Sequence, residues 1–173
     1  MSLADGGCRA AGPWHPGQDD THREIRDECF HMAMPSRSMF ARIARRRTAG
    51  ILREWGAPGD VIDTAELLAS ELVANAARFS PADITLTLWR LPGMLVIEVS
   101  DQAAEIPEAR EPDADSVSGR GLVLVGALSR EWSYYFPRPG WKTVYAVIDT
   151  GPPVSEPGDF PAGTDNNPGR PAR

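Results

Sequence analysis

Residues 84–99 contain two alternating segments joined by a tight turn. Every second residue of Ile84-Thr-Leu-Thr-Leu-Trp89 is apolar, and residues 95–99 repeat the alternation. Between them, Leu91-Pro-Gly-Met94 carries the Pro-Gly pair typical of a turn. Two strands joined by so short a connection are antiparallel. We therefore predict a β-hairpin at this point in the chain.

Helical periodicity appears twice before this hairpin, and each helix follows a residue able to cap it, Ser36 or Asp60. A Gly-containing turn near residues 137–140 predicts a second hairpin. The expected elements are a strand at 29–34, helices at 37–55 and 61–79, strands at 84–89 and 95–99, a helix at 122–128, and strands at 132–136 and 143–148.

This order of elements favours an α+β fold. Strands paired through short turns predict a two-layer α/β sandwich, with a mostly antiparallel mixed sheet and helices on one face. The folded domain is expected to span residues 28–150. Residues 1–27 and 151–173 are rich in Gly and Pro without a hydrophobic period, so we expect a flexible arm and a disordered tail.

Composition narrows the classes of function. The net charge of −6 argues against general nucleic-acid binding, which needs a basic surface. The longest nearly apolar run, residues 122–128, is too short to cross a membrane, and the first residues lack a secretory signal pattern. Cys8 and Cys29 are spaced for neither a zinc site nor a disulfide framework. We expect a cytoplasmic protein without direct membrane or nucleic-acid contacts.

Polar residues interrupt the apolar pattern of the second helix. Glu71 and Asn75 are four residues apart and share one face. An amide oxygen suits Mg²⁺ as a ligand, and a carboxylate can accept a proton or orient a nucleophile. The alternative is an ordinary solvated polar stripe.

Three segments further along the chain carry possible ligand contacts. Asp101 follows a predicted strand, where its carboxylate can accept a hydrogen bond from an exocyclic amine or can serve as a turn residue. Gly119, Arg120 and Gly121 open a helix, where backbone N–H groups can approach a phosphate, although glycines also end loops for geometric reasons. The Thr143 hydroxyl can reach a base edge beside Asp101, or Thr143 can be a simple strand residue.

Taken in this order, these segments resemble the histidine-kinase-like (GHKL, Bergerat-fold) ATPases over about residues 34–149. The stretches Leu52-Arg-Glu-Trp-Gly56 and Ser70-Glu-Leu-Val-Ala-Asn-Ala76 are similar to the single-domain anti-sigma-factor serine kinases. The resemblance implies ATP and Mg²⁺ as cofactors. It implies Glu71 as the general base, Asn75 as the Mg²⁺ ligand, and nucleotide contacts from Arg78, Asp101, Gly119, Arg120, Gly121, Leu122 and Thr143.

The chain departs from that family at several points, and Phe79 stands where many relatives have histidine. An Asp-x-Gly-x-Gly pattern is usual there, and Ala103 and Glu105 replace both glycines here. Residues 102–118 would form the lid over the nucleotide. These departures bear on nucleotide affinity and turnover more than on the fold.

Two functions are therefore expected, and a third alternative is a transcription-linked protein that touches DNA through the arginine-rich first helix. In the first, the protein is a serine/threonine kinase that phosphorylates a small antagonist protein of the anti-anti-sigma type and sequesters a sigma factor or similar regulator, with a homodimer possible. In the second, it is a catalytically weak or inactive ATP-binding-fold scaffold that acts by protein binding only. Arg42, Arg45 and Arg46 form either a solvated face or a docking surface for an acidic partner.

Overall fold

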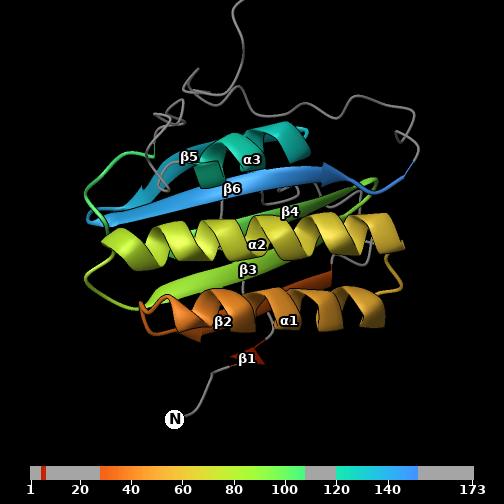
Figure 1. Ribbon diagram of the computed structural model, residues 1–173, viewed down its shortest axis with the longest axis horizontal. Coiled ribbons are helices and arrows are strands. Elements are labelled where there is room, and N and C mark those ends of the chain that lie inside the picture. Colours follow the sequence, from red (N-terminus) through yellow and green to blue (C-terminus); the bar gives the residue numbers. More distant parts are fainter. Residues whose placement is uncertain (1–4, 7–27, 108–119, 152–173) are drawn as a thin grey trace, which may run out of the picture.

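The computed structural model describes residues 5–6, 28–107 and 120–151, and it has two layers. A sheet forms one layer and three helices cover one of its faces (Figure 1). This arrangement confirms the predicted α+β sandwich. The elements are β1 (Asp5–Gly6), β2 (Glu28–Met34), α1 (Met39–Glu54), α2 (Gly59–Phe79), β3 (Ile84–Leu91), β4 (Met94–Asp101), α3 (Arg120–Leu128), β5 (Glu131–Arg138) and β6 (Trp141–Asp149).

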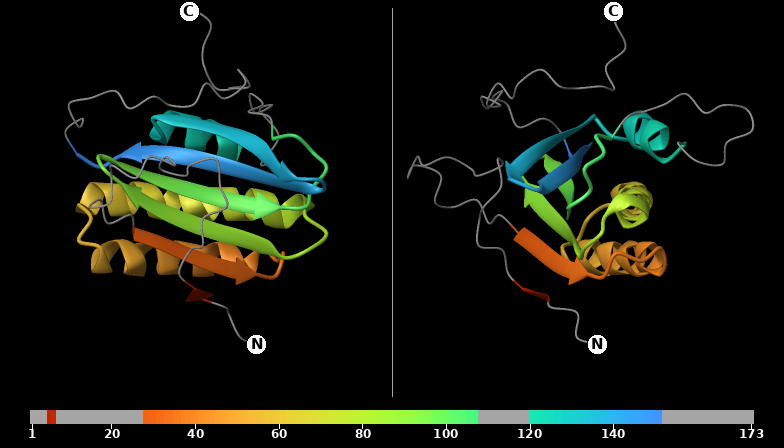
Figure 2. Two further views of the ribbon diagram at one scale, coloured as in Figure 1. Left: turned by 180° about the vertical axis from the view of Figure 1, so that it is seen from behind. Right: turned by 90° about the vertical axis from the view of Figure 1, so that its left-hand side faces the viewer.

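The sheet has the strand order β1-β2-β3-β4-β6-β5, and every neighbouring pair among the described strands is antiparallel. The strands β4 and β6 are neighbours in the sheet but not in the sequence, and α3 lies on the connection between them. Figure 2 shows all three helices on the same side of the sheet. The opposite face therefore has no helix among the described elements.

Both predicted hairpins are present, and each turns at a Pro-Gly pair. In the first, Leu91 pairs with Met94 across Pro92 and Gly93, and in the second Arg138 pairs with Trp141. The glycines Gly93 and Gly140 have φ angles of 75° and 76°. These positive values are the reason for glycine at the third position of each turn.

The hydrophobic core lies between the sheet and α2. Alternate residues of each strand face the helices, and α2 contributes Leu68, Leu72 and Val73, all nearly inaccessible to solvent. Helix α1 packs beside α2. Helix α3 packs against α2 and β5, where Gly126 lies against the Trp132 indole. The central position of α2 lets it carry polar residues toward α3.

Both proposed helix caps are wrong. Helix α1 begins at Met39 after Ser38, and the Ser36 hydroxyl instead donates to the carbonyl oxygens of Ala77 and Ser80. Helix α2 begins at Gly59, so Asp60 lies in its first turn rather than before it. The two predictions were wrong because the position of a cap depends on where the backbone turns into the helix, and the residue type alone does not specify that point.

Two further features depart from the expectations. Asp5 and Gly6 pair with Met32 and His31 as the short strand β1, which was not predicted. Cys29 is disulfide-bonded, so the expectation of no disulfide is wrong for this residue. None of the helices within the described ranges is long and apolar enough to span a bilayer.

Candidate functional site

The carboxylate of Glu71 lies against the first turn of α3. Glu71 is partly buried on α2. A Cβ atom added to Gly121 would stand 2.7 Å from Glu71 Oε2. That separation is too short for any residue with a side chain unless the carboxylate moves. The fold thus brings a possible proton acceptor to the helix start that was predicted to contact phosphate, where the helix dipole also favours a negative charge.

Asp101 ends β4 with its carboxylate buried. The side chain is on the helix-covered face, and only 1% of the residue is exposed. Asp101 Oδ1 accepts a hydrogen bond of 2.7 Å from the Ala103 N–H. Burial raises the pKa of Asp101 above its ordinary value, while the Ala103 N–H and the nearby Lys142 ammonium act in the opposite direction. The second oxygen, Oδ2, has no hydrogen-bond partner among the described residues.

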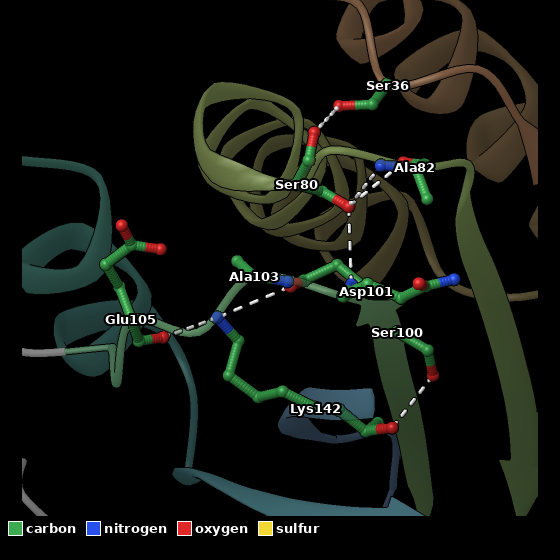
Figure 3. Close-up of polar contacts among 10 residues, drawn as sticks. Ser36, Ser80, Ala82, Ser100, Asp101, Ala103, Glu105 and Lys142 are labelled. Atoms are coloured by element: carbon green, nitrogen blue, oxygen red, sulfur yellow. Dashed lines mark hydrogen bonds and ion pairs between the residues drawn. The ribbon is translucent and has the colours of Figure 1, made fainter. Parts of the chain in front are cut away.

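Lys142 is the cation beside this carboxylate. Its Nζ atom lies 3.4 Å from Asp101 Oδ1 and donates to the carbonyl oxygen of Glu105 at 2.7 Å. Figure 3 shows the lysine side chain extending from β6 to the loop after β4. Because Asp101 and Lys142 are directly opposite in the antiparallel register, their side chains share one face of the sheet.

Ser80 connects the end of α2 to this loop. Its hydroxyl accepts from the Gln102 N–H at 3.3 Å and donates to the Ala82 carbonyl oxygen at 2.9 Å (Figure 3). The Ser36 hydroxyl donates to the Ser80 carbonyl oxygen. The last turns of α2, which carry Asn75, are thereby tied to the segment that carries Asp101.

Comparison with known proteins agrees with this geometry. A family model described as a histidine kinase-like ATPase domain matches residues 34–148. The chain belongs to the histidine kinase-like ATPase family. No curated protein matches it. Membership supports ATP binding and a kinase-like regulatory function for this ATPase domain.

The ATPase domain offers a fitting environment for a nucleotide. The Glu71 carboxylate occupies the space where a Cβ of residue 121 would stand, and Asp101 Oδ2 accepts no hydrogen bond from a described residue. Within residues 28–107 and 120–151 there is no cluster of three or more His, Cys, Asp or Glu side chains for a metal. Mg²⁺ does not require such a cluster, because it commonly uses few protein ligands together with phosphate oxygens. Asn75 on α2 is the residue predicted to hold it.

Thr143 does not lie beside Asp101. Its hydroxyl is 2.8 Å from the Ser100 hydroxyl. Since side chains alternate along a strand, Ser100 and Thr143 face away from the helices, whereas Asp101 and Lys142 face toward them. The contact predicted between Thr143 and a base at Asp101 is therefore not supported by the ATPase domain's geometry.

The remaining residues that were predicted to contact the nucleotide are Leu122, Arg78, Gly119 and Arg120. Leu122 is buried in the hydrophobic core, so its side chain anchors α3. Arg78 is exposed, and its guanidinium lies 5.2 Å from the centre of the Phe79 ring. Gly119 and the Arg120 side chain lie outside the described residues. Glu71, Gly121 and Asp101 remain the nucleotide-contact candidates whose surroundings the structure defines.

The two replaced glycines are accommodated without strain. No non-glycine residue in the described ranges has a positive φ, so Ala103 adopts an ordinary backbone conformation. Its N–H donates to Asp101, and its side chain is buried. Glu105 is exposed, and its side chain points away from Lys142 (Figure 3). Its contribution to the site is the backbone carbonyl oxygen.

The residue missed from the sequence is Lys142. From the sequence, a contact is predicted for Thr143 and none for Lys142, but only one of two consecutive strand residues can face the site. Counting by twos from the core residues Val144, Ala146 and Ile148 identifies position 142 as the one on their face. That alternation was the available signal.

The arginines of α1 are largely explained by local contacts. Arg45 and Arg53 both pair with Glu66, at 3.2 Å and 3.6 Å. Arg47 lies 6.0 Å from the centre of the Phe30 ring. Arg42 and Arg46, the other two residues of the predicted face, have no such contact among the described residues, so the solvated face and the docking surface both remain predictions for them.

Proposed function

We propose that this protein is an ATP-dependent serine/threonine kinase of the anti-sigma-factor type. In this function it phosphorylates a small antagonist protein and, in another state, sequesters a sigma factor or similar regulator. The observation that carries the proposal is the contact between Glu71 and the first turn of α3 at Gly121. It supports the proposal because a carboxylate beside a helix start could act as a proton acceptor next to phosphate oxygens bound by backbone N–H groups.

Each residue then has a defined task. Glu71 accepts the proton from the serine or threonine hydroxyl of the substrate protein. The freed oxygen attacks the γ-phosphorus while the bond from that phosphorus to the β,γ-bridging oxygen breaks, and ADP leaves with that oxygen. Asp101 accepts a hydrogen bond from the adenine amino group. The backbone at Gly121 approaches the phosphates, and Asn75 holds Mg²⁺. Bound Mg-ATP supplies the phosphoryl group, and the metal neutralises its charge.

The partners follow from this proposal. The phospho-acceptor is an antagonist protein of the anti-anti-sigma type, and the sequestered target is a sigma factor or similar regulator. We further propose a cytoplasmic protein able to form a homodimer, acting without direct nucleic-acid or membrane contact. Support comes from the family and from the net charge of −6, which disfavours binding to nucleic acid.

A transfer assay tests the kinase. Wild type, Glu71→Gln and Asn75→Ala are incubated with γ-labelled ATP, Mg²⁺ and candidate antagonist proteins. We expect wild type to label an antagonist and Glu71→Gln to lose about 10²- to 10⁴-fold in rate, the usual contribution of a general base. Equal labelling by Glu71→Gln removes the assigned role, and no labelling of any candidate by wild type counts against the kinase.

A scaffold without phosphoryl transfer is the second candidate. It is favoured by the pairing of Asp101 with Lys142, which satisfies part of the carboxylate without a nucleotide. Thermal unfolding with Mg-ATP separates the possibilities. Ligand at about one hundred times Kd stabilises by roughly 2.7 kcal/mol. A shift without transfer indicates a nucleotide-holding scaffold, and no shift at millimolar ATP indicates a scaffold that acts through protein contacts alone.

A further inference from the structure

Asp101 and Lys142 form an acceptor and a donor side by side on the helix-covered face. Both are almost fully buried, with 1% and 3% of each residue exposed. Their charged atoms are 3.4 Å apart. Lys142 is also the only lysine in the sequence. The Lys142 ammonium therefore adds a hydrogen-bond donor beside the Asp101 carboxylate, which is an acceptor.

One Lys142 donor is accounted for by the Glu105 carbonyl oxygen, and the contact with Asp101 accounts for a second. An ammonium group has three donors. Asp101 keeps Oδ2 without a partner among the described residues. The pair can therefore offer one further acceptor and one further donor to a ligand.

Adenine has the complementary edge. Its 6-amino group is a donor and the adjacent N1 atom is an acceptor. We propose that Lys142 is a base-recognition residue that donates to adenine N1 while Asp101 accepts from the 6-amino group. This inference rests on the proposed ATP binding. Guanine placed the same way would set its O6 against the carboxylate and its N1–H against the ammonium, so the pair rejects it.

The opposing account is a purely structural role, in which Lys142 only holds the loop at Glu105. The two roles differ in what they do to ligands. A structural lysine affects every nucleotide equally. A lysine that contacts N1 affects only nucleotides that possess N1, because its buried charge loses a partner when N1 is missing.

Binding of ATP and 1-deaza-ATP, which has carbon in place of N1, provides the test. With wild type, calorimetric titration should show 1-deaza-ATP binding about ten- to a hundredfold more weakly than ATP, as expected for a hydrogen bond to a charged group. In Lys142→Met the ratio of the two dissociation constants should fall to near one. Arg130→Met is the matched control.

Arg130 suits this purpose because it also pairs with an aspartate, Asp149, at 3.1 Å, but at the opposite end of β6. Arg130→Met removes one positive charge and should keep the wild-type ratio. If Lys142→Met fails to fold, the two nucleotides still decide the question in wild type. Protein labelled with ¹³C at the lysine ε-carbon has a single lysine signal, which should shift with ATP and shift less with 1-deaza-ATP.

The outcomes separate the two proposals. Equal affinity of wild type for ATP and 1-deaza-ATP, or a lysine signal that saturating ATP does not move, overturns base recognition by Lys142 and leaves ATP binding intact. A Lys142→Met variant that weakens both nucleotides by the same factor assigns Lys142 the structural role. Failure of wild type to bind ATP at all overturns the proposed function, and this inference with it.

Discussion

Glu71 and Gly121 touch across the contact between α2 and α3: the carboxylate Oε2 lies 2.7 Å from where a Cβ of residue 121 would stand. The contact joins the polar face of α2 to the start of α3. The atom in the way is the end of a flexible side chain, so a larger residue at 121 displaces the carboxylate rather than the helix. A substitution at residue 121 can therefore move the Glu71 carboxylate and test its role in catalysis while α3 stays in place.

Gly121→Ala should leave stability almost unchanged and reduce phosphoryl transfer. Alanine is about 1 kcal/mol more favourable than glycine inside a helix, which offsets the cost of rotating Glu71. A carboxylate displaced by about 1 Å should slow transfer roughly ten- to a hundredfold. Thermal unfolding and the labelled-ATP assay measure the two effects. A large loss of stability with normal transfer would show that the contact is only structural.

Stability should decrease with rising pH because of Glu98. This residue is 5% exposed and accepts from Trp89 Nε1 at 2.8 Å and the Tyr135 hydroxyl at 3.1 Å. Burial raises its pKa above the ordinary value of 4.5, although both hydrogen bonds act against this. The folded state thus favours the protonated form. Its stabilisation is complete below pH 4.5 and is lost as pH rises through the raised pKa.

Urea unfolding at a series of pH values measures this dependence in wild type and Glu98→Gln. Each unit by which the pKa is raised corresponds to about 1.4 kcal/mol. The variant should give the flatter profile above pH 4.5. Asp149→Asn is the matched control, since its carboxylate is exposed at the end of β6. Identical profiles for wild type and Glu98→Gln would exclude Glu98 as the cause.

Two glycines should respond in opposite directions to alanine. Gly140 has a φ of 76° and nothing within 4 Å of an added Cβ, so Gly140→Ala should cost about 1–2 kcal/mol through backbone strain alone. Gly50 lies inside α1 with equally open surroundings. Gly50→Ala should gain about 0.5–1 kcal/mol from helix propensity. Chemical denaturation of both variants tests the prediction, which a shared direction of change would contradict.

Removing the Ser80 hydroxyl should loosen the loop that carries Asp101. Ser80→Ala deletes the acceptor of the Gln102 N–H and should lower the free energy of unfolding by about 1 kcal/mol. Ser70→Ala is the control, because the Ser70 hydroxyl bonds only within α2, to the Leu67 carbonyl oxygen. Urea unfolding compares them. An equal, small effect of the two substitutions would mean that the Ser80 link does not hold the loop.

The fold followed from the sequence because its signals are local. Alternation at residues 84–99 and the Pro-Gly pair specify an antiparallel hairpin without reference to the rest of the chain. The predicted helix caps were wrong because a polar side chain near a helix start can form its hydrogen bond with another part of the molecule. The Ser36 hydroxyl, for example, donates to the carbonyl oxygen of Ala77, which lies near the end of α2 and 41 residues further along the chain. Strand β1 has only two residues, too few to show a period.

The site was predictable only in part, since its geometry depends on tertiary contacts. Glu71 and Asp101 were identified by residue type and position. The approach of Glu71 to Gly121 depends on how α3 packs on α2, which no local pattern specifies. Thr143 and Lys142 are adjacent in sequence and face opposite ways, so the assignment depended on the register between β4 and β6.

The burial of Lys142 also affects how the protein can be handled in the laboratory. Apart from the α-amino group of the chain, Lys142 is the only primary amine in the sequence, and it is 3% exposed. Amine-directed dyes and crosslinkers must reach this side chain by the same approach as the proposed nucleotide. The rate of attachment at Lys142 would therefore measure how accessible that approach is.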